Sequence, residues 1–206
     1  MPTKKSTNLQ ELRRLFRRAK AEGNQELLAE LELVLTALHK PRQVAITVLA
    51  KLLNQANSHV TKHYIAGVLG AAREVQVLKA LMRAATKPEN RGYNADYFWA
   101  CAHYDCTPYL PFFVRFLLGC EDPGEAMVAC VAVIEAMEGP FIPAVVKRYI
   151  AKLLQRKQPL LLSDLQLQSE VFIIQAGYAL LDKYFDQVDK EWKNEVSASK
   201  PEQSVD

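Results

Sequence analysis

The stretch PYLPFFVR, residues 108–115, returns 32 positions later as PFIPAVVK, residues 140–147. The same shift aligns two earlier segments, VAITVLAK (44–51) and QVLKALMR (76–83). In all four copies apolar residues occupy the third, sixth and seventh positions, which is the i, i+3, i+4 spacing of one face of a helix. The shift therefore predicts four copies of a helix at a period of 32 residues.

A second amphipathic segment precedes each of these helices, so the predicted repeating unit is a pair of helices. Small residues in the preceding segments, such as Gly67, Ala100 and Ala132, are expected to let neighbouring helices approach closely. A pair of this length buries its apolar face only by stacking against the next pair. We therefore predict an all-α fold, a right-handed α-solenoid of about four helix pairs. The preceding segments are 30–40, 62–73, 96–105 and 126–137.

The repeated phrase also predicts where two of the helices begin and which residues they bury. Pro108 and Pro140 are expected in the first turn of a helix, where a missing backbone N–H costs nothing. Leu110 and Ile142 hold the third position of the phrase and are expected in the core.

Both ends of the chain depart from the repeat and are predicted to be capping helices. Residues 8–22 form an amphipathic segment with Leu9, Leu12 and Phe16 on its apolar side. Gly23 is expected to end this helix and Asn24 to cap the next one. Ser163 and Gln166 form a capping-box pattern that would begin a long C-terminal helix. That helix is expected to bury Phe172, Leu180, Leu181, Tyr184 and Phe185.

We predict a single domain over residues 8–194, between a disordered basic start (1–7) and a disordered tail (195–206). Linkers are expected where Pro, Gly and Asn cluster between the helices. The predicted parts are four repeats at about 27–58, 59–90, 91–122 and 123–154, and a C-terminal cap at 163–194.

Composition favours a cytoplasmic protein with no membrane partner. No stretch approaches the roughly 18 consecutive apolar residues of a membrane-spanning helix. The charged start, MPTKKSTNLQELRR, lacks the apolar core of a secretory signal. The cysteines form no CxxC pair and are expected to be buried thiols. They are Cys101, Cys106, Cys120 and Cys130.

The sequence carries no signature of catalysis or of a cofactor. The Walker, GxGxxG, GxSxG and HExxH motifs do not occur in it. His59 and His63 have the spacing of metal ligands, but no third ligand follows nearby, so a solvated pair is expected. His103 and Asp105 are interpreted as turn and packing residues, because adjacent residues on a helix point in different directions. We therefore predict no enzyme activity, no cofactor and no metal site.

The eighth position of the repeated phrase is basic in every copy, and this feature points to a function. Neighbouring helices in a stack lie about 8–10 Å apart, so four such positions would span roughly 30 Å. Lys79 is expected beside them because it lies four residues before Arg83, and Tyr109 and Phe112 are expected near Arg115. Aromatic residues together with arginine anchor many interfaces. The alternative is that each basic residue only solvates its helix or pairs with a nearby glutamate. The four positions, which we call the basic row, are Lys51, Arg83, Arg115 and Lys147.

The phrases TPYLPFFVRFL and GPFIPAVVKRYI resemble the opening of the second helix in short bacterial HEAT-like α-solenoid repeats. The resemblance covers about residues 27–154 and implies that the second helices line a concave face. Residues 98–118, FWACAHYDCTPYLPFFVRFLL, are similar to small HEAT-like proteins that act as immunity or antitoxin partners of secreted toxins.

The resemblance and the basic row together predict a non-enzymatic, monomeric interaction module that binds and occludes a protein partner, with a toxin domain as the partner implied. Nucleic-acid binding, as in the HEAT-like alkylpurine DNA glycosylases, is the alternative, because the basic row and the basic N-terminal helix could neutralise phosphates. A net charge of +3 is small for that role. A scaffold subunit without an inhibitory role is the third interpretation.

Overall fold

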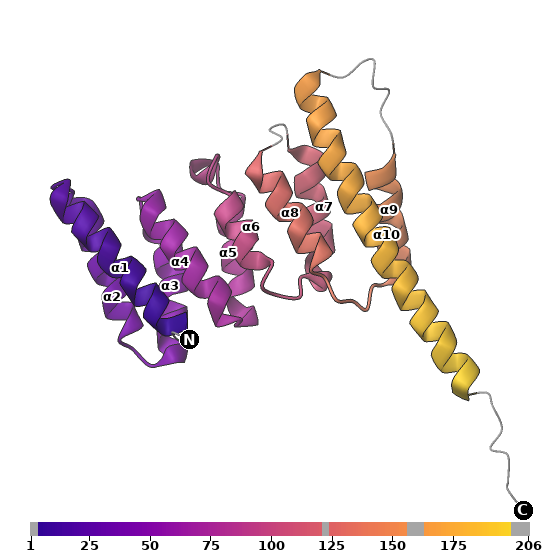
Figure 1. Ribbon diagram of the computed structural model, residues 1–206, viewed down its shortest axis with the longest axis horizontal. Coiled ribbons are helices and arrows are strands. Elements are labelled where there is room, and N and C mark those ends of the chain that lie inside the picture. The colour runs from indigo at the N-terminus through magenta and orange to yellow at the C-terminus, as the bar shows by residue number, and fades with distance from the viewer. Residues whose placement is uncertain (1–3, 121–123, 156–162, 199–206) are drawn as a thin grey trace, which may run out of the picture. The chain divides into compact units, whose positions relative to one another are not determined.

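The computed structural model describes residues 4–120, 124–155 and 163–198, and within these ranges every regular element is helical, as predicted. Figure 1 shows the α-helices in chain order. They are α1 (Lys4–Ala21), α2 (Gln25–Leu38), α3 (Arg42–Gln55), α4 (His59–Ala72), α5 (Leu78–Ala85), α6 (Ala95–Cys101), α7 (Leu110–Gly119), α8 (Glu125–Glu135), α9 (Pro143–Leu154) and α10 (Asp164–Ala198). Short 3-10 turns are η1 (Val75–Val77), η2 (Pro88–Asn90) and η3 (Thr107–Tyr109).

The chain divides into two compact units, residues 1–104 and 105–206. The sequence predicted one domain, and the division falls inside the third predicted repeat, 91–122. The basic row is therefore shared equally: Lys51 and Arg83 belong to the N-terminal unit, and the other two positions belong to the C-terminal unit.

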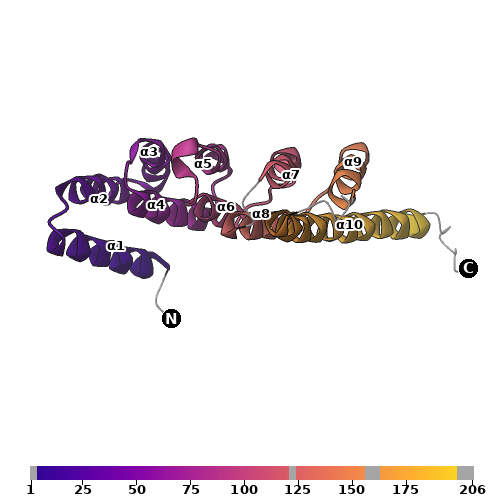
Figure 2. The same ribbon diagram turned by 90° about the horizontal axis from the view of Figure 1, so that it is seen from above.

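In the N-terminal unit, α2, α4 and α6 form one layer and α3 and α5 form another, as Figure 2 shows. Contacts join α2 to α4, α4 to α6 and α3 to α5 within the layers, while α1 packs on α2. The core between the layers consists of large apolar side chains that are almost completely buried. They include Leu31, Leu49, Ile65, Leu78, Leu81 and Phe98.

The C-terminal unit has the same two-layer arrangement. In it α8 and α10 lie in one layer and α7 and α9 in the other (Figure 2), with contacts from α7 to α9 and from α8 to α10. Phe113 and Leu117 of α7 and Leu180 of α10 lie in the core and are fully buried. The helix pattern thus places the apolar stripe of the first three copies of the repeated phrase mainly in the core.

Two predicted helix caps are confirmed. The side-chain oxygen of Asn24 accepts a hydrogen bond of 2.9 Å from the backbone N–H of Leu27, while Gly23 ends α1 with a φ of +65°. At the start of α10 the backbone N–H of Ser163 donates to the side chain of Gln166 at 3.0 Å, and the Gln166 N–H donates back to the Ser163 hydroxyl.

The helices at the two ends are longer than predicted. α1 already begins at Lys4, inside the segment expected to be disordered, and α10 continues through residues 195–198 of the predicted tail. Residues 1–3 and 199–206 lie outside the described residues.

The two copies of the repeated phrase begin their helices differently. In the first copy Pro108 lies in η3, Pro111 lies in the first turn of α7, and Leu110 is buried as predicted. In the second copy Pro140 precedes the helix instead of lying in its first turn, because α9 begins only at Pro143.

The later start of α9 makes one core prediction wrong. Ile142 is 67% exposed, and Phe141 is buried in its place. The cause is Gln187 on α10, whose side-chain oxygen accepts from the Phe141 N–H at 2.6 Å and whose amide donates to the Phe141 carbonyl at 3.2 Å. These bonds hold residue 141 inward, so the next residue points outward.

Other packing predictions also need correction. Gly67 is exposed, and a β-carbon added there would have no neighbour within 4 Å. Gly70 makes the close approach instead, because a β-carbon there would lie 3.0 Å from the α-carbon of Ala100. Leu9 and Phe185, both expected on buried sides, are 41% and 62% exposed. Leu12, Leu180 and Tyr184 are buried as predicted. The buried stripes are completed by Leu15 and Ala19 on α1 and by Ile173 and Ala176 on α10. Within the described ranges, no helix combines the length and the apolar character that a membrane crossing requires.

Candidate protein-interaction site

The helices α3, α5, α7 and α9, which we call the second-layer helices, contain no aspartate or glutamate, although the chain has 23 acidic residues. Every lysine and arginine on them is exposed. The other layers differ: α2 and α8 carry glutamates and no lysine or arginine. Acidic residues of the layered helices therefore lie outside the second-layer helices, on α2, α6, α8 and α10. The exposed basic residues are Arg42, Lys51, Lys79, Arg83, Arg115, Lys147, Arg148 and Lys152.

In the N-terminal unit, three of these residues have no ion-pair partner among the described residues: Lys51, Lys79 and Arg83. Lys79 and Arg83 stand four residues apart on α5, so two like charges face the same way, an arrangement that mildly destabilises a helix. Arg42 differs, because its guanidinium lies 3.1 Å from the Glu74 carboxylate. The alternative for the basic row was that each residue pairs with a nearby glutamate. Lys51 and Arg83 form no such pair among the described residues.

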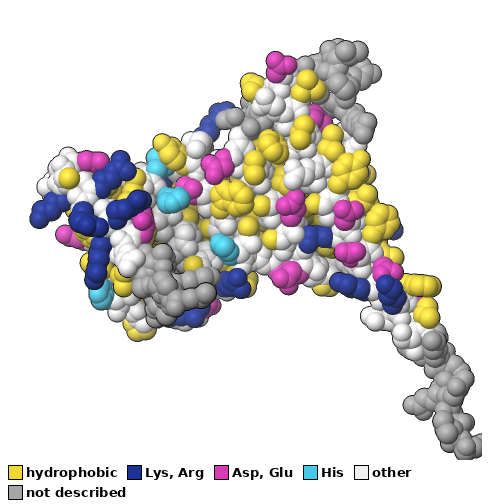
Figure 3. Space-filling model, in the orientation of Figure 1, with side chains coloured by type: hydrophobic (Ala, Val, Ile, Leu, Met, Phe, Trp, Pro, Cys, Tyr) yellow, Lys and Arg dark blue, Asp and Glu magenta, His cyan; other side chains and the backbone are white. Residues whose placement is uncertain are grey.

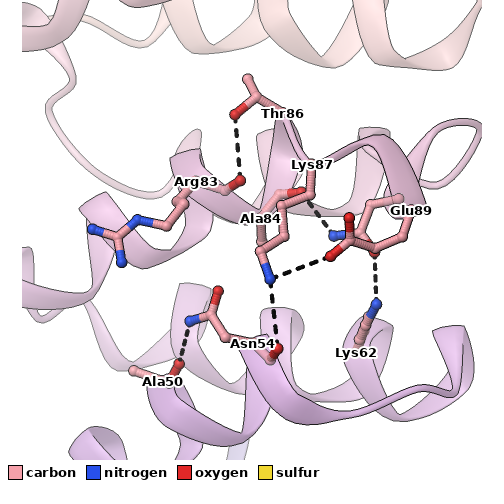
Figure 4. A network of polar contacts seen from close by, with 9 residues as sticks. Ala50, Asn54, Lys62, Arg83, Ala84, Thr86, Lys87 and Glu89 are labelled. Atoms are coloured by element: carbon pink, nitrogen blue, oxygen red, sulfur yellow. Dashed lines mark hydrogen bonds and ion pairs between the residues drawn. The ribbon is translucent and has the colours of Figure 1, made fainter.

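A polar network fixes the end of α5 that carries Arg83. The buried Lys62 ammonium donates to the side-chain oxygen of Asn90 at 2.8 Å, and the Asn90 amide donates to the Ala84 carbonyl at 2.8 Å. Lys87 also lies 3.5 Å from the backbone oxygen of Asn54 on α3. Figure 4 shows the guanidinium of Arg83 pointing away from this network, so the backbone is held while the charge faces outward.

In the C-terminal unit, the basic side chains of α9 lie beside aromatic rings. The Lys147 ammonium is 5.8 Å from the centre of the Tyr184 ring, and Arg148 is 5.1 Å from that of Tyr149. Phe112 is half-buried and meets Phe113 edge-on at 5.1 Å between ring centres. Tyr109 is also half-buried. All seven residues predicted for the site are therefore at least partly accessible.

An apolar groove of about 360 Å³ lies between the N-terminal ends of α7 and α9, the two helices that carry Arg115 and Lys147. Pro111, Ile142 and Val145 are among its walls, and Asp105 and Thr107 lie at its polar edge. The sequence did not indicate this groove, because the motif predicted that Ile142 is buried. The sequence also did not indicate Arg148 and Lys152 as site residues, because they fall outside the eighth position of the repeated phrase.

Asp105 ties together the two loops at the polar edge of the groove. Its carboxylate accepts hydrogen bonds from the Thr107 N–H (3.0 Å), the Thr107 hydroxyl (2.6 Å) and the Glu138 N–H (3.2 Å). Partial burial raises the pKa of Asp105, but the bonds from Thr107 and Glu138 and the charge of Lys183 outweigh it, so the pKa lies below its ordinary value. Asp105 itself is exposed and lies between α6 and η3, outside any helix.

The paired histidines have separate partners. The His59 ring stacks on the Tyr93 ring with centroids 3.8 Å apart, and His63 Nδ1 lies 2.8 Å from the Asp96 carboxylate. His103 is exposed. In the part of the chain that the structure describes, no three His, Cys, Asp or Glu side chains are grouped so as to hold a metal ion.

The cysteines are thiols in apolar surroundings. Cys101, Cys106 and Cys130 are buried and Cys120 is half-buried. Burial raises the pKa of the Cys106 thiol to about 12, with a smaller contribution from Asp105. Because the thiolate is the reactive form, Cys106 is a poor nucleophile at neutral pH.

The chain matches no family model, no curated protein and no solved structure. The candidate site therefore stands on the charge and geometry of the second-layer helices themselves.

Proposed function

We propose that this protein is a non-enzymatic interaction module whose second-layer helices bind an acidic partner protein. The observation that carries the proposal is that four helices without a single acidic residue expose every lysine and arginine they have. A surface kept only for solubility normally mixes both signs of charge. A surface of one sign instead speeds encounter with an oppositely charged partner and rejects like-charged proteins.

The apolar groove favours a protein over a nucleic acid. Interfaces between proteins are held by apolar or aromatic anchors surrounded by a polar rim. The groove between α7 and α9, with the 67% exposed Ile142 in its wall, offers such an anchor point on the two helices that carry Arg115 and Lys147. A phosphate backbone would use the basic residues but not the groove.

We further propose that the helix pairs are HEAT-like repeats, stacked at the 32-residue period with a right-handed twist, and that the second-layer helices line a concave face. The support is the alignment of the four phrases and the recurrence of the two-layer arrangement in each unit. The similarity of residues 98–118 to immunity proteins supports a cytoplasmic inhibitor that occludes a toxin domain. Inhibition by occlusion needs no catalytic group.

The proposal is tested by capture of partners from a lysate of the source cells, with and without nuclease treatment. Three double reversals are compared with the wild type: K51E/R83E, R115E/K147E, and R17E/K20E as a control with the same change in charge on exposed positions of α1. We expect acidic proteins on the wild type and the control, and their loss from at least one second-layer variant. Capture that survives in both second-layer variants would place the site elsewhere, and capture abolished by nuclease alone would indicate a nucleic acid.

A further inference from the structure

α10 has a second apolar face that is exposed among the described residues of the C-terminal unit. Its inner face packs against α8 and α9. Its outer face carries five large apolar side chains that are between 40% and 62% exposed. Figure 3 shows hydrophobic side chains along α10 on the face seen there, with acidic side chains beside them. We call these five residues the outer stripe: Val171, Tyr178, Phe185, Val188 and Trp192.

The outer stripe has the spacing of a coiled-coil seam. Val171, Tyr178, Phe185 and Trp192 recur every seven residues, and Val188 falls three after Phe185. The half-buried Ile174 and Leu181 occupy the two equivalent positions before Val188. A repeat of seven residues keeps one stripe of a helix facing a partner helix, since two supercoiled helices have about 3.5 residues per turn. The stripe thus presents an a and d seam over roughly 30 Å of helix.

The last part of α10 has little support from its own unit. Tyr184 is the final buried residue, and every residue from Val188 to Ser197 is exposed. Helices shorter than about 12–15 residues are marginal in water unless they pack against something. A helix lying on the outer stripe would cover Val188 and Trp192 and supply that packing.

The charges beside the outer stripe indicate what kind of helix fits. Asp182 and Asp189 occupy the positions that flank a seam on one edge, and Glu191 flanks it on the other. α10 as a whole carries seven acidic and three basic residues. In an antiparallel pair, a second copy would place these acids opposite the same acids, and in a parallel pair opposite uncharged residues. A second copy therefore gains no ion pair in either orientation, whereas lysine or arginine in a partner helix does.

We propose that the outer stripe binds an amphipathic helix of a partner protein that has an apolar seam flanked by lysine or arginine. This surface is distinct from the proposed acidic-partner site, because it lies on α10 and has the opposite charge. Asp189 already pairs with Lys193 at 2.6 Å, so a basic residue of the partner helix would compete with Lys193 for the Asp189 carboxylate.

The test uses the full chain and a labelled synthetic helix of four heptads with leucine at a and d and lysine at e and g. Its lysines repel one another, which keeps the peptide from pairing with itself. We expect F185E/W192E to weaken binding by roughly tenfold or more, because it places charge in the centre of the interface. D182N/D189N should weaken it by roughly two- to tenfold, since edge ion pairs contribute less. K190A is the control and should change nothing, because residue 190 lies on the side of α10 away from the stripe.

Three results would overturn the inference. Binding that F185E/W192E leaves unchanged would show that the peptide binds elsewhere, and binding that D182N/D189N leaves unchanged would remove the argument for a basic partner. A wild-type dimer in sedimentation equilibrium that F185E/W192E converts to a monomer would show that a second copy covers the stripe. K51E/R83E serves to separate the two sites: it should bind the peptide normally whether or not the acidic-partner site exists.

Discussion

The second-layer helices and α10 bury similar apolar stripes but expose very different surfaces. α7 and α9 turn only basic and apolar side chains outward, and the groove lies between their ends. α10 turns outward an apolar seam with acids at its edges. The difference teaches that the buried stripe of a helix fixes its place in the fold and leaves the opposite face open for other uses. Here the two outer faces suit partners of opposite charge.

The largest expected effect separates the inner and outer faces of α7. Phe113 is fully buried, so F113A should destabilise the fold by about 3–5 kcal/mol. The same change at Phe112, its half-buried neighbour, should lower the free energy of unfolding by much less. Chemical denaturation of the two variants gives the comparison. Equal losses would mean that α7 has no distinct outer face, and the comparison with α10 would break down.

The same contrast on α10 should be somewhat smaller. L180A removes a fully buried side chain and should cost about 2–5 kcal/mol. F185A, at a position 62% exposed, should stay within about 0.5 kcal/mol of the wild type. Thermal melting of the isolated variants tests this. A loss at Phe185 as large as at Leu180 would show that the outer stripe is already packed within the protein.

A smaller effect is expected at the polar edge of the groove. D105N weakens the bonds that join the two loops and should cost about 1 kcal/mol at neutral pH. Because the pKa of Asp105 is lowered in the folded protein, its contribution is complete above the ordinary carboxyl pKa and is lost as pH falls through the folded value. The difference in unfolding free energy between D105N and the wild type should therefore shrink below about pH 4. Chemical denaturation at a series of pH values measures this difference, and a difference that does not change with pH would contradict this account. D182N is the control variant.

The smallest effect on stability should come from reversing the charges of the second-layer helices. Lys51, Arg83 and Arg115 are exposed, so K51E/R83E and R115E should each shift the free energy of unfolding by no more than about 0.5 kcal/mol per site. Circular dichroism melts check this. A substantial loss of stability would mean that these residues serve the fold, and the argument for a binding surface would lose its basis.

The parts of the fold set by neighbouring residues were predictable from the sequence. The caps at Asn24 and at Ser163 with Gln166 depend on residues three apart, and the exposure of the basic row follows from its place in the helical pattern. The start of α9 was not predictable, because it depends on bonds between Phe141 and Gln187, which are 46 residues apart in the chain.

Predicting the site was limited in the same way. The basic row came from a repeat that the sequence shows directly, whereas the groove came from a loop placed by a distant side chain. α10 posed a different difficulty, because it is apolar on two faces and the pattern alone does not tell which one is buried. Phe185 was assigned to the inner face together with Tyr184, although adjacent residues on a helix point about 100° apart.

The most direct test of the central claim is the dissociation constant of a captured acidic partner for the wild type and for K51E/R83E/R115E/K147E, measured alongside R17E/K20E. If the second-layer helices form the binding surface, the quadruple variant should bind at least roughly tenfold more weakly, because like charges would meet across the interface, while its melting temperature and the binding of the control stay near those of the wild type. Equal affinities for the wild type and the quadruple variant would contradict the account.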